Sequence, residues 1–577
     1  MTDVRSRMIG CWLGKCIGGT LGGPYEGREG PHALEFYDPV PTGMMPNDDL
    51  DLQVVWLEKL RETGGAVSPK ILADAWQEHV NFHPDEYGIA LRNLARKLYP
   101  PFSGAFDNPF RDGMGCAIRT EIWACLAPGD PEKAVALAEA DGCVDHTGDG
   151  LDAARFLAAL QSMAFAESDR ERLIDAAMKF VSPAGRLAAA LRDTRAAWAE
   201  TGDWAETRRR IVAAHRVENW TDVCQNLAFI LLGWLAGGGD FGRSLCAAVN
   251  CGGDSDCTGA TLGALLGILA PDSIPAKWSA PVGRAVVLSP GIVGMHPPAD
   301  IDAMTDELVA LSPSVRLVGP RPAREGSLPS PRTACVADSP LCVSVVYPQS
   351  GAFVPGAEGS LCVVFGNDSG EEFAGSVRLG LPRGWKCAGA GEEELELKLA
   401  PGAEKRLELK VAPPAGMDLR PCRNLLAMEL KSGELRWRLD AGLPLSVPFE
   451  IGGKATETPT HDIPLAPSGV TTLALEFVVP ARDTYRIVLC APARVRFSVD
   501  GAYACDDSSC GTVSAIHRPT GAHADVALAP GAHLLEATVG EAQGGAPALA
   551  RLSIGYPSAW RLVPDVEYAP PRRRVSK

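Results

Sequence analysis

The sequence lacks the cysteine patterns that mark disulfide-rich and zinc-binding proteins. Its 17 cysteines are an odd number scattered over 577 residues, and none belongs to a Cys-x-x-Cys pair. Neither a disulfide framework nor a cysteine-based zinc site is therefore expected. Cys505 and Cys510 could bridge a loop in an oxidising compartment, but we favour free thiols.

Long hydrophobic runs and an export signal are also lacking. The most apolar stretch, residues 227–235, is far too short to cross a bilayer. The first residues show no basic segment followed by an apolar segment and a cleavage site of small residues, as a secretory signal would. We therefore expect a cytoplasmic protein that does not associate with a membrane.

Positive charge is scarce relative to negative charge. The formal net charge is -16, which argues against a protein that binds the phosphate backbone of nucleic acids. The basic run at residues 572–574 is expected to be a solvated tail. With 46% hydrophobic and 22% charged residues the chain can bury hydrophobic cores, and its length requires more than one.

Hydrophobic periodicity divides the chain into a helical half and a β half. From residue 1 to 311 apolar residues recur at three- and four-residue spacing, with typical helix starts at Ser68-Pro69 and Asp130-Pro131. Residues 312–340 are rich in Pro, Ser, Arg and Gly, as in a linker. Beyond them the apolar period becomes two, which predicts β-sandwiches at 341–450 and 455–567. The expected fold is multidomain: an all-α domain followed by two all-β sandwiches.

The first predicted helix carries a glycine at every fourth position. These glycines lie near one face, so another backbone can approach closely. Lys15 interrupts the apolar run, which argues against a membrane dimerisation face, and we favour simple helix packing. Glu26 comes one step later, where the helix should give way to a Gly/Pro-rich loop. The glycines are Gly10, Gly14, Gly18 and Gly22.

Two short acidic clusters precede apolar, helix-like runs. The first is Asn-Asp-Asp-Leu-Asp at 47–51, and the second is Gly-Gly-Asp-Ser-Asp-Cys at 252–257. Aspartates at a helix start can simply be caps. Two such loops together favour a shared cation, because buried carboxylates are costly without a positive partner. Oxygen ligands would select magnesium, with manganese or calcium as alternatives, and one or two ions could bind.

The order of these motifs resembles the ADP-ribosylglycohydrolase family, which includes the dinitrogenase-reductase-activating glycohydrolases and the lens J-crystallins. The motifs are Gly-x3-Gly-x3-Gly-x3-Gly-x3-Glu at 10–26, Asn-Asp-Asp at 47–49, Asp-His at 145–146, and Gly-Gly-Asp-x-Asp at 252–256 before a glycine-bearing helix. The resemblance covers the chain to about residue 300. It implies an all-helical domain with a magnesium site, where metals orient ribose hydroxyls while water displaces the group at the anomeric carbon.

Carried over residue by residue, the resemblance implies roles for several side chains. Glu26 matches the glutamate near the scissile bond, and His146 matches a position near the substrate cleft, although a lone histidine is more often structural. The catalytic candidates are Glu26, Asp49 and His146. The candidate metal ligands are Asn47, Asp48, Asp49, Asp254 and Asp256, and the candidate substrate contacts are Asp51, Gly252, Gly253 and Cys257.

The chain also departs from the family pattern. Asn47 replaces one threonine of the first acidic loop and Leu50 the other, with Asp51 adjacent. Cys257 replaces the threonine of the second loop, and Gly19 stands where the family has an acidic residue. These changes point to a divergent branch that acts on a different glycoside.

The β segments resemble modules that accompany carbohydrate-active enzymes. The segment 341–450 looks immunoglobulin-like and 455–567 looks like a jelly roll. Glycan binding and a structural role, including homo-oligomerisation through these domains, stay equally open.

We therefore expect a metal-dependent glycoside hydrolase that cleaves an N- or O-glycosidic bond of a furanoside-type sugar, with a sugar or glycoside as its partner. The alternatives are an ADP-ribosyl-protein hydrolase that removes ADP-ribose, and a catalytically inactive binding or structural protein. Leu50 and Cys257 favour the inactive reading, whereas the retained aspartates oppose it.

Overall fold

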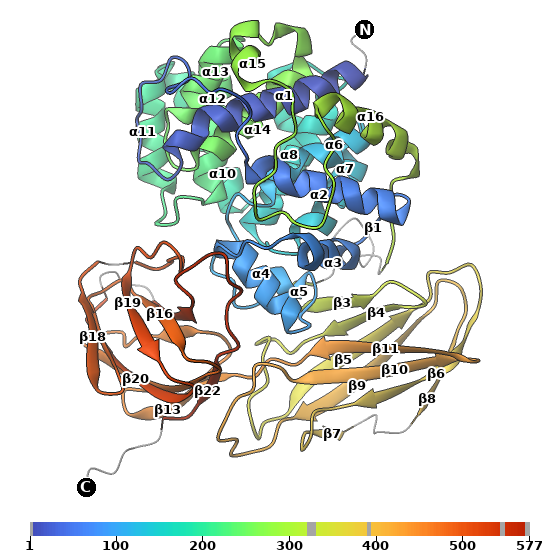
Figure 1. Cartoon of the computed structure of the whole chain (residues 1–577), viewed down its shortest axis with the longest axis vertical. Coiled ribbons are helices and arrows are strands. Elements are labelled where there is room, and N and C mark those ends of the chain that lie inside the picture. The colour runs from blue at the N-terminus through green and yellow to red at the C-terminus, as the bar shows by residue number, and fades with distance from the viewer. Residues whose placement is uncertain (1–3, 320–329, 389–393, 510, 543–547, 572–577) are drawn as a thin grey trace. The chain divides into compact units, whose positions relative to one another are not determined.

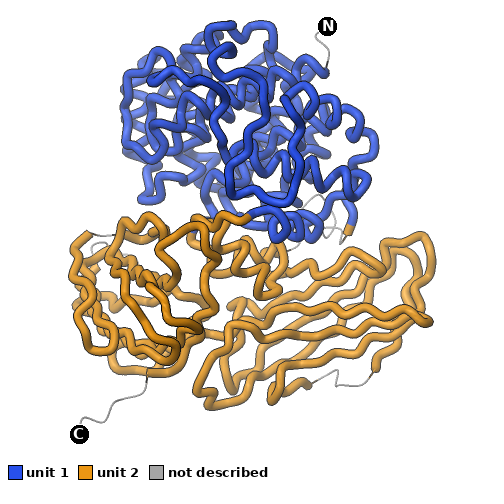
Figure 2. Tube along the Cα trace, in the orientation of Figure 1, with its two compact units in different colours: residues 1–80, 110–318 blue, residues 81–109, 319–577 orange. Residues whose placement is uncertain are grey.

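The computed structural model of the chain divides into two compact units (Figure 2). Unit 1 comprises residues 1–80 and 110–318, and unit 2 comprises residues 81–109 and 319–577. The structure describes residues 4–319, 330–388, 394–509, 511–542 and 548–571. Cys510 and the basic run 572–574 lie outside the described residues. The cysteines of the described ranges are free thiols.

Unit 1 is helical, as its apolar periodicity predicts (Figure 1). The short strands β1 (Ala66–Val67) and β2 (Arg316–Leu317) pair in parallel within it. Its helices are α1 (Val4–Gly22), α2 (Asp48–Thr63), α3 (Pro69–His79), α6 (Glu121–Leu126), α7 (Pro131–Gly142), α8 (Asp149–Met163), α9 (Arg170–Ala177), α10 (Arg186–Thr201), α11 (Trp204–His215), α12 (Val223–Ala236), α13 (Phe241–Val249), α14 (Ser255–Leu269), α15 (Ala276–Val282) and α16 (Ile301–Leu311).

Two predicted helix starts are confirmed by their caps. The Ser68 hydroxyl accepts a hydrogen bond from the Ile71 amide at 3.0 Å, and α3 begins at Pro69. The Asp130 carboxylate accepts from the Lys133 amide at 3.1 Å, and α7 begins at Pro131. In each case a capping side chain satisfies an amide that the helix leaves free, and proline fits the first turn.

The glycines of α1 pack against a second row of glycines on α14. Gly18 faces Gly259, and a Cβ added to Gly18 would lie 1.9 Å from the Gly259 carbonyl oxygen. A Cβ on Gly14 would lie 2.0 Å from the Gly263 oxygen. The close approach predicted from the glycine spacing is therefore confirmed. Helices α1 and α14 run side by side (Figure 1). The chain on either side of Glu26 therefore lies next to the second acidic cluster, since the Gly27 amide donates to the Gly253 oxygen at 3.0 Å.

The described residues of unit 2 form mainly strands in four antiparallel sheets, which confirms the predicted all-β region. The sheet orders are β3-β4-β5-β9-β7, β11-β10-β6-β8, β14-β21-β16-β19, and β13-β12-β15-β20-β17-β18 with β22 also on β15. Its elements are α4 (Asp85–Ala95), α5 (Phe102–Ala105), β3 (Thr333–Ala337), β4 (Cys342–Val346), β5 (Gly359–Gly366), β6 (Phe373–Gly380), β7 (Lys386–Ala388), β8 (Leu395–Leu399), β9 (Glu404–Ala412), β10 (Leu425–Ser432), β11 (Leu435–Gly442), β12 (Val447–Ile451), β13 (Lys454–Thr458), β14 (Asp462–Pro464), β15 (Thr471–Val479), β16 (Asp483–Cys490), β17 (Val495–Val499), β18 (Ala502–Asp507), β19 (Ala522–Leu528), β20 (Gly531–Val539), β21 (Leu549–Gly555) and β22 (Glu567–Ala569).

Strand alternation builds the core of the C-terminal sheets. In β15 the buried residues Leu473, Leu475 and Phe477 alternate with more exposed ones, as a period of two requires. They pack with Ile487 of β16 and Leu535 of β20.

Residues 81–109, which hydrophobic periodicity groups with the helical half, belong to unit 2 in the structure. A buried aspartate holds this segment against the strands. Asp107 accepts hydrogen bonds from Arg551 at 2.8 Å and pairs with His461 at 2.7 Å and Arg92 at 3.2 Å. Such a long-range cluster leaves no local sequence signal.

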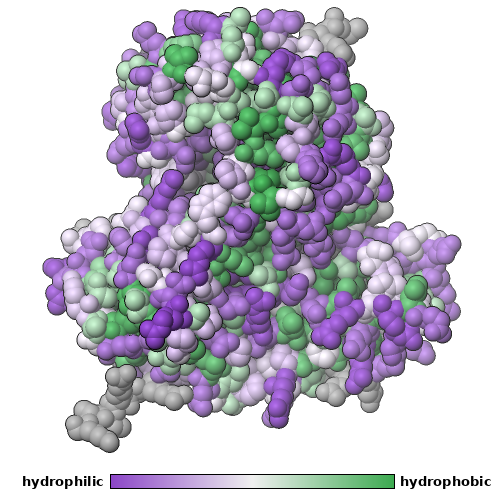
Figure 3. All heavy atoms as spheres, in the orientation of Figure 1, coloured by the Kyte–Doolittle hydropathy of each residue, from purple (hydrophilic) through white to green (hydrophobic). Residues whose placement is uncertain are grey.

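The segment 312–340, expected to be a linker, contains β2 and β3, and residues 320–329 between them lie outside the described residues. No helix in the described part of the chain combines the length and apolarity needed to cross a membrane. Hydrophilic and hydrophobic residues are interspersed on the face seen in Figure 3.

Candidate metal centre

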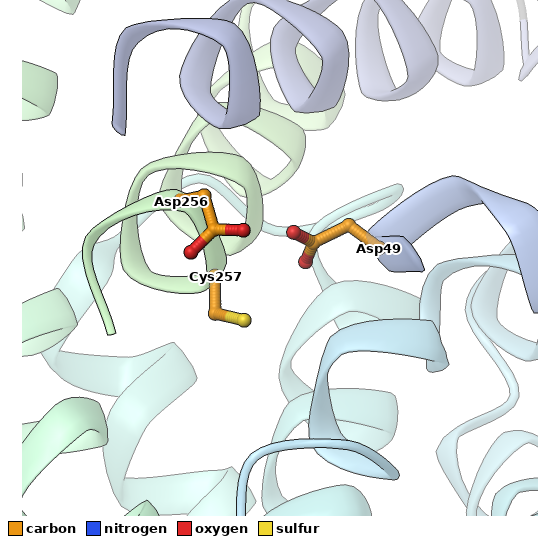
Figure 4. Close-up of side chains that lie close together, drawn as sticks. All are labelled: Asp49, Asp256 and Cys257. Carbon is orange, nitrogen blue, oxygen red and sulfur yellow. The ribbon is translucent and has the colours of Figure 1, made fainter. Parts of the chain in front are cut away.

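The two acidic clusters meet at the N-termini of α2 and α14. Asp49, Asp256 and Cys257 each offer one ligand atom, and these atoms lie within 4.8 Å of one another. Figure 4 shows the Asp49 and Asp256 carboxylates pointing toward each other, with the Cys257 sulfur beside them. All three side chains are buried. Carboxylates some two hundred positions apart in the sequence thus converge on one point.

Two carboxylate oxygens in this group lack the hydrogen bonds that burial normally requires. Within the described ranges, Asp49 Oδ2 and Asp256 Oδ1 have no hydrogen-bond partner. Asp49 is only 1% exposed and Asp256 only 6%. Because a buried charged oxygen is costly without a partner, the arrangement suits a cation between the two side chains.

The pKa values of these carboxyl groups reflect the same crowding. Burial raises the pKa of Asp256 well above its usual range, and the charges of Asp254, Glu26 and Asp49 raise it further. Burial likewise raises the pKa of Asp254 to about 7, with Glu26 and Asp48 adding to the effect. A bound divalent cation would oppose both causes, since it favours the ionised form of every nearby carboxyl group.

Asn47 caps α2 and also faces the second cluster. Its amide oxygen accepts from the Asp49 amide at 2.7 Å, and its amide nitrogen donates to Asp256 Oδ2 at 3.4 Å. The oxygen predicted to be a metal ligand is thus already engaged in capping. Asp48, the first residue of α2, is exposed beside this group.

Gly252 and Gly253 shape the second acidic loop through their backbones. Both adopt left-handed conformations, with φ of 77° and 75°. A Cβ on Gly252 would lie 2.1 Å from the Gly30 nitrogen. The Gly27 amide donates to the Gly253 oxygen at 3.0 Å, and the Gly253 amide donates to the Arg28 oxygen at the same distance. These contacts fix the loop that follows Glu26, and Glu26 itself is exposed next to Asp254 and Asp256.

Asp254 is held by a side chain of α12. Its amide donates to Asn226 Oδ1 at 3.2 Å, and the Asn226 amide nitrogen donates to the Trp220 and Asp222 carbonyls at 2.9 Å each. Asn226 is fully buried, so it fixes the position of the loop without contacting solvent.

Asp51 and His146 lie in other surroundings. Asp51 accepts a hydrogen bond from the Ser289 amide at 3.0 Å, and burial raises its pKa to about 7. His146 is fully buried, with Nδ1 3.0 Å from Asp145, which Arg119 also holds at 2.6 Å. Asp51 is thus bound to the loop that contains Ser289, and His146 belongs to the buried ion pair of Asp145 and Arg119.

The structure adds Lys15, which the sequence indicates only as an interruption of the first helix. Its ammonium lies 3.5 Å from Asp49 Oδ1 and 3.2 Å from Glu121, and it donates to the Ile118 carbonyl at 2.7 Å. Lys15 is 1% exposed, and although burial alone would lower its pKa, Glu121 and Asp49 raise it above the usual range. The sequence signal for a buried ion pair is the lysine itself, which lies inside an otherwise apolar, glycine-bearing helix.

Comparison with known proteins follows the division of the chain. A family model described as ADP-ribosylglycohydrolase matches residues 1–316, and one described as the NPCBM-associated NEW3 domain of alpha-galactosidase matches residues 353–419. Among curated proteins no match was found.

Solved structures give weaker similarities. An ADP-ribosylglycohydrolase-related protein complex is 22% identical over 55% of this chain and 98% of its own, with a TM-score of 0.38. The alpha-L-rhamnosidase from Dictyoglumus thermophilum is 9% identical over 35% of this chain and 26% of its own, with a TM-score of 0.14. The family model spans more than half of the residues, and the chain belongs to the ADP-ribosylglycohydrolase family.

Proposed function

We propose that unit 1 is a metal-dependent glycoside hydrolase that cleaves an N- or O-glycosidic bond of a furanoside-type sugar. Membership of the family supports a glycohydrolase-type function, and the family is generally metal-dependent. The observation that carries the proposal is the pair of buried, unpartnered oxygens on Asp49 and Asp256.

The donor set fits a divalent ion. Asp49 and Asp256 would hold it, with Asp48 and Asp254 as neighbouring ligands, and Asn47 would orient Asp256 through its amide. Such an ion, when bound, fixes sugar hydroxyls and stabilises developing negative charge. The carboxylate oxygens suit magnesium, manganese or calcium, whereas the Cys257 sulfur is the one donor of the group that does not.

Lys15 would bind one carboxylate oxygen of Asp49 and leave the other for the metal ion. Its ammonium lies 3.5 Å from Oδ1, and Oδ2 has no hydrogen-bond partner in the described part of the chain. The carboxylate is therefore oriented before anything binds, so less rotational freedom is lost when it becomes a ligand.

Glu26 would act on the water. Glu26 is our candidate for the catalytic base because its carboxylate neighbours Asp254 and Asp256 and is exposed, so that a substrate can reach it. In this proposal Glu26 orients a water molecule toward the anomeric carbon and accepts its proton, while the glycosidic bond breaks and the leaving group departs with the bonding electrons. The backbone bonds from Gly27 and Gly253 keep that side chain beside the acidic group.

The test compares carboxylate-to-amide variants inside and outside the group. Asp49→Asn and Asp256→Asn should each lower hydrolysis of aryl furanosides by about 100-fold or more, beyond the usual loss for groups that only orient a ligand. Asp74→Asn, at a half-buried pair with Lys70 on α3 that lies outside the acidic group, is the control and should leave turnover unchanged. Unchanged turnover in both cluster variants would exclude the proposal.

Removal of ADP-ribose from protein is the second candidate, favoured by the family itself. Release of ADP-ribose from modified arginine or serine peptides distinguishes it from hydrolysis of another furanoside. The replacements at Gly19, Leu50 and Cys257 support the other glycoside.

A further inference from the structure

We propose that Cys257 is itself a metal ligand, and that the centre therefore prefers a borderline divalent transition ion of the zinc class over magnesium. The inference rests on the proposed function in one respect only, namely that the acidic group binds a divalent ion. It assigns to Cys257 a role different from the substrate contact expected from the sequence.

The geometry brings the sulfur into the ligand group. Cys257 follows Asp256 in the first turn of α14, and its Sγ lies within 4.8 Å of ligand oxygens on both Asp49 and Asp256. Tetrahedral zinc with bonds of about 2.0–2.3 Å places two of its ligand atoms about 3.3–3.8 Å apart. The three atoms lie within 4.8 Å of one another, so a closure of about 1 Å brings them to the spacing of one coordination sphere.

A separate observation indicates that something positive belongs at this point. Asp49 Oδ2 and Asp256 Oδ1 are buried without a hydrogen-bond partner in the described part of the chain. Asp49 and Asp256 face one another with the sulfur beside them (Figure 4). Lys15 supplies positive charge at Asp49 Oδ1, whereas Asp49 Oδ2 keeps no hydrogen-bond partner among the described residues.

The donor chemistry decides which ion fits. Two carboxylates and a thiolate form a ligand set that zinc accepts, and affinity of such sites rises through the first-row divalent ions toward copper and zinc. Magnesium takes oxygen ligands and retains several of its waters. A sulfur atom beside the ion would therefore occupy a coordination position without forming a favourable bond to magnesium. The thiol proton passes to solvent as the metal–sulfur bond forms, and no oxidant or reductant is required.

Cobalt(II) provides a direct readout, since it replaces zinc and its bond to a thiolate gives a charge-transfer band in the near ultraviolet. The full chain is stripped with a chelator and titrated with cobalt. We expect the band in the natural protein and its loss in Cys257→Ser. Cys246→Ser is the matched control, because Cys246 on α13 is as buried as Cys257, both being 6% exposed, and lies outside the group. The control should keep the band.

Competition between ions gives the second measurement. Zinc should bind the natural protein more tightly than magnesium, and Cys257→Ser should weaken zinc by about 10–100-fold or more while leaving magnesium binding in place. Cys257→Thr, which restores the residue of the family pattern, checks the result should the serine variant fold poorly.

The outcomes separate this inference from the proposed function. If cobalt binds without the band, or the band survives in Cys257→Ser, the inference is wrong while a metal-dependent hydrolase stands. If magnesium binds as tightly as zinc, the inference is also wrong. If no divalent ion binds at all, both proposals are overturned.

Discussion

Replacing Gly18 by alanine tests whether the contact between α1 and α14 sets the geometry of the centre. The new Cβ would lie 1.9 Å from the Gly259 oxygen, whereas ordinary contact begins at 3.4 Å. The helices would therefore have to separate by about 1.5 Å at this point. The Gly259 oxygen is a backbone atom, and it cannot move aside as the end of a flexible side chain can.

The magnitude follows from two opposing effects. Alanine in a helix gains about 0.5–1 kcal/mol over glycine. Overpacking of a close contact costs about 1–3 kcal/mol, and a clash with rigid backbone lies at the upper end of that range. The free energy of unfolding of unit 1 should therefore fall by about 2–2.5 kcal/mol, and each kcal/mol lowers Tm by about 2–4 °C in a domain of about 150–250 residues.

The assay combines thermal unfolding with calorimetric titration of a divalent ion. Because α14 begins at the second acidic cluster, a displaced α14 should also weaken ion binding. Gly23→Ala is the matched control: a Cβ there meets nothing within 4 Å, so stability should change by less than about 0.5 kcal/mol. If Gly18→Ala matches this control in both Tm and ion affinity, the packing argument is refuted.

Three further predictions concern charge. Lys15→Met should lower the free energy of unfolding by about 3–5 kcal/mol, because Asp49 and Glu121 then lose their buried counter-charge. The double variant Lys15→Met, Glu121→Gln should recover part of this loss in a denaturant titration. Equal losses in the single and double variants would contradict the pairing. In unit 2, burial would raise the pKa of Asp107, but His461, Arg551 and Arg92 outweigh it and hold that pKa well below the usual range. The stabilisation by Asp107 is therefore complete above about pH 4, the unfolded value, and is lost as pH falls below it, so an acid titration of Asp107→Asn should show a flatter profile than the natural protein; identical profiles would exclude this role. Finally, a divalent ion at 100 times its Kd should stabilise the natural protein by about 2.7 kcal/mol in thermal unfolding and should not stabilise Asp49→Asn, and equal stabilisation of both would place the ion elsewhere.

The sequence predicts those features that follow a short period or a local cap. The glycine spacing in α1 predicted close packing, and its partner is the glycine row of α14, which the family resemblance had placed after the second acidic cluster. Strand alternation predicted the β region in the same way. These signals are local because each residue's role is set by its own helix or strand.

Long-range contacts escaped prediction because nothing near them in the sequence encodes the partner. Lys15 acquires its role only when α1 meets Asp49 and Glu121, which lie 34 and 106 positions away. Asp107 joins residues 81–109 to Arg551 of β21, 444 positions later. The two acidic clusters were predicted to converge, yet the capping bond of Asn47 and the loop bond of Asp51 depend on atomic positions that spacing does not determine.

The central claim is that Asp49 and Asp256 share a divalent cation. Anomalous diffraction from crystals grown with manganese or zinc tests it most directly, because the signal locates the ion without reference to activity. We expect an anomalous peak within about 2.0–2.3 Å of carboxylate oxygens of both Asp49 and Asp256. A fully occupied ion elsewhere on the chain, with no peak between these two side chains, would contradict the claim.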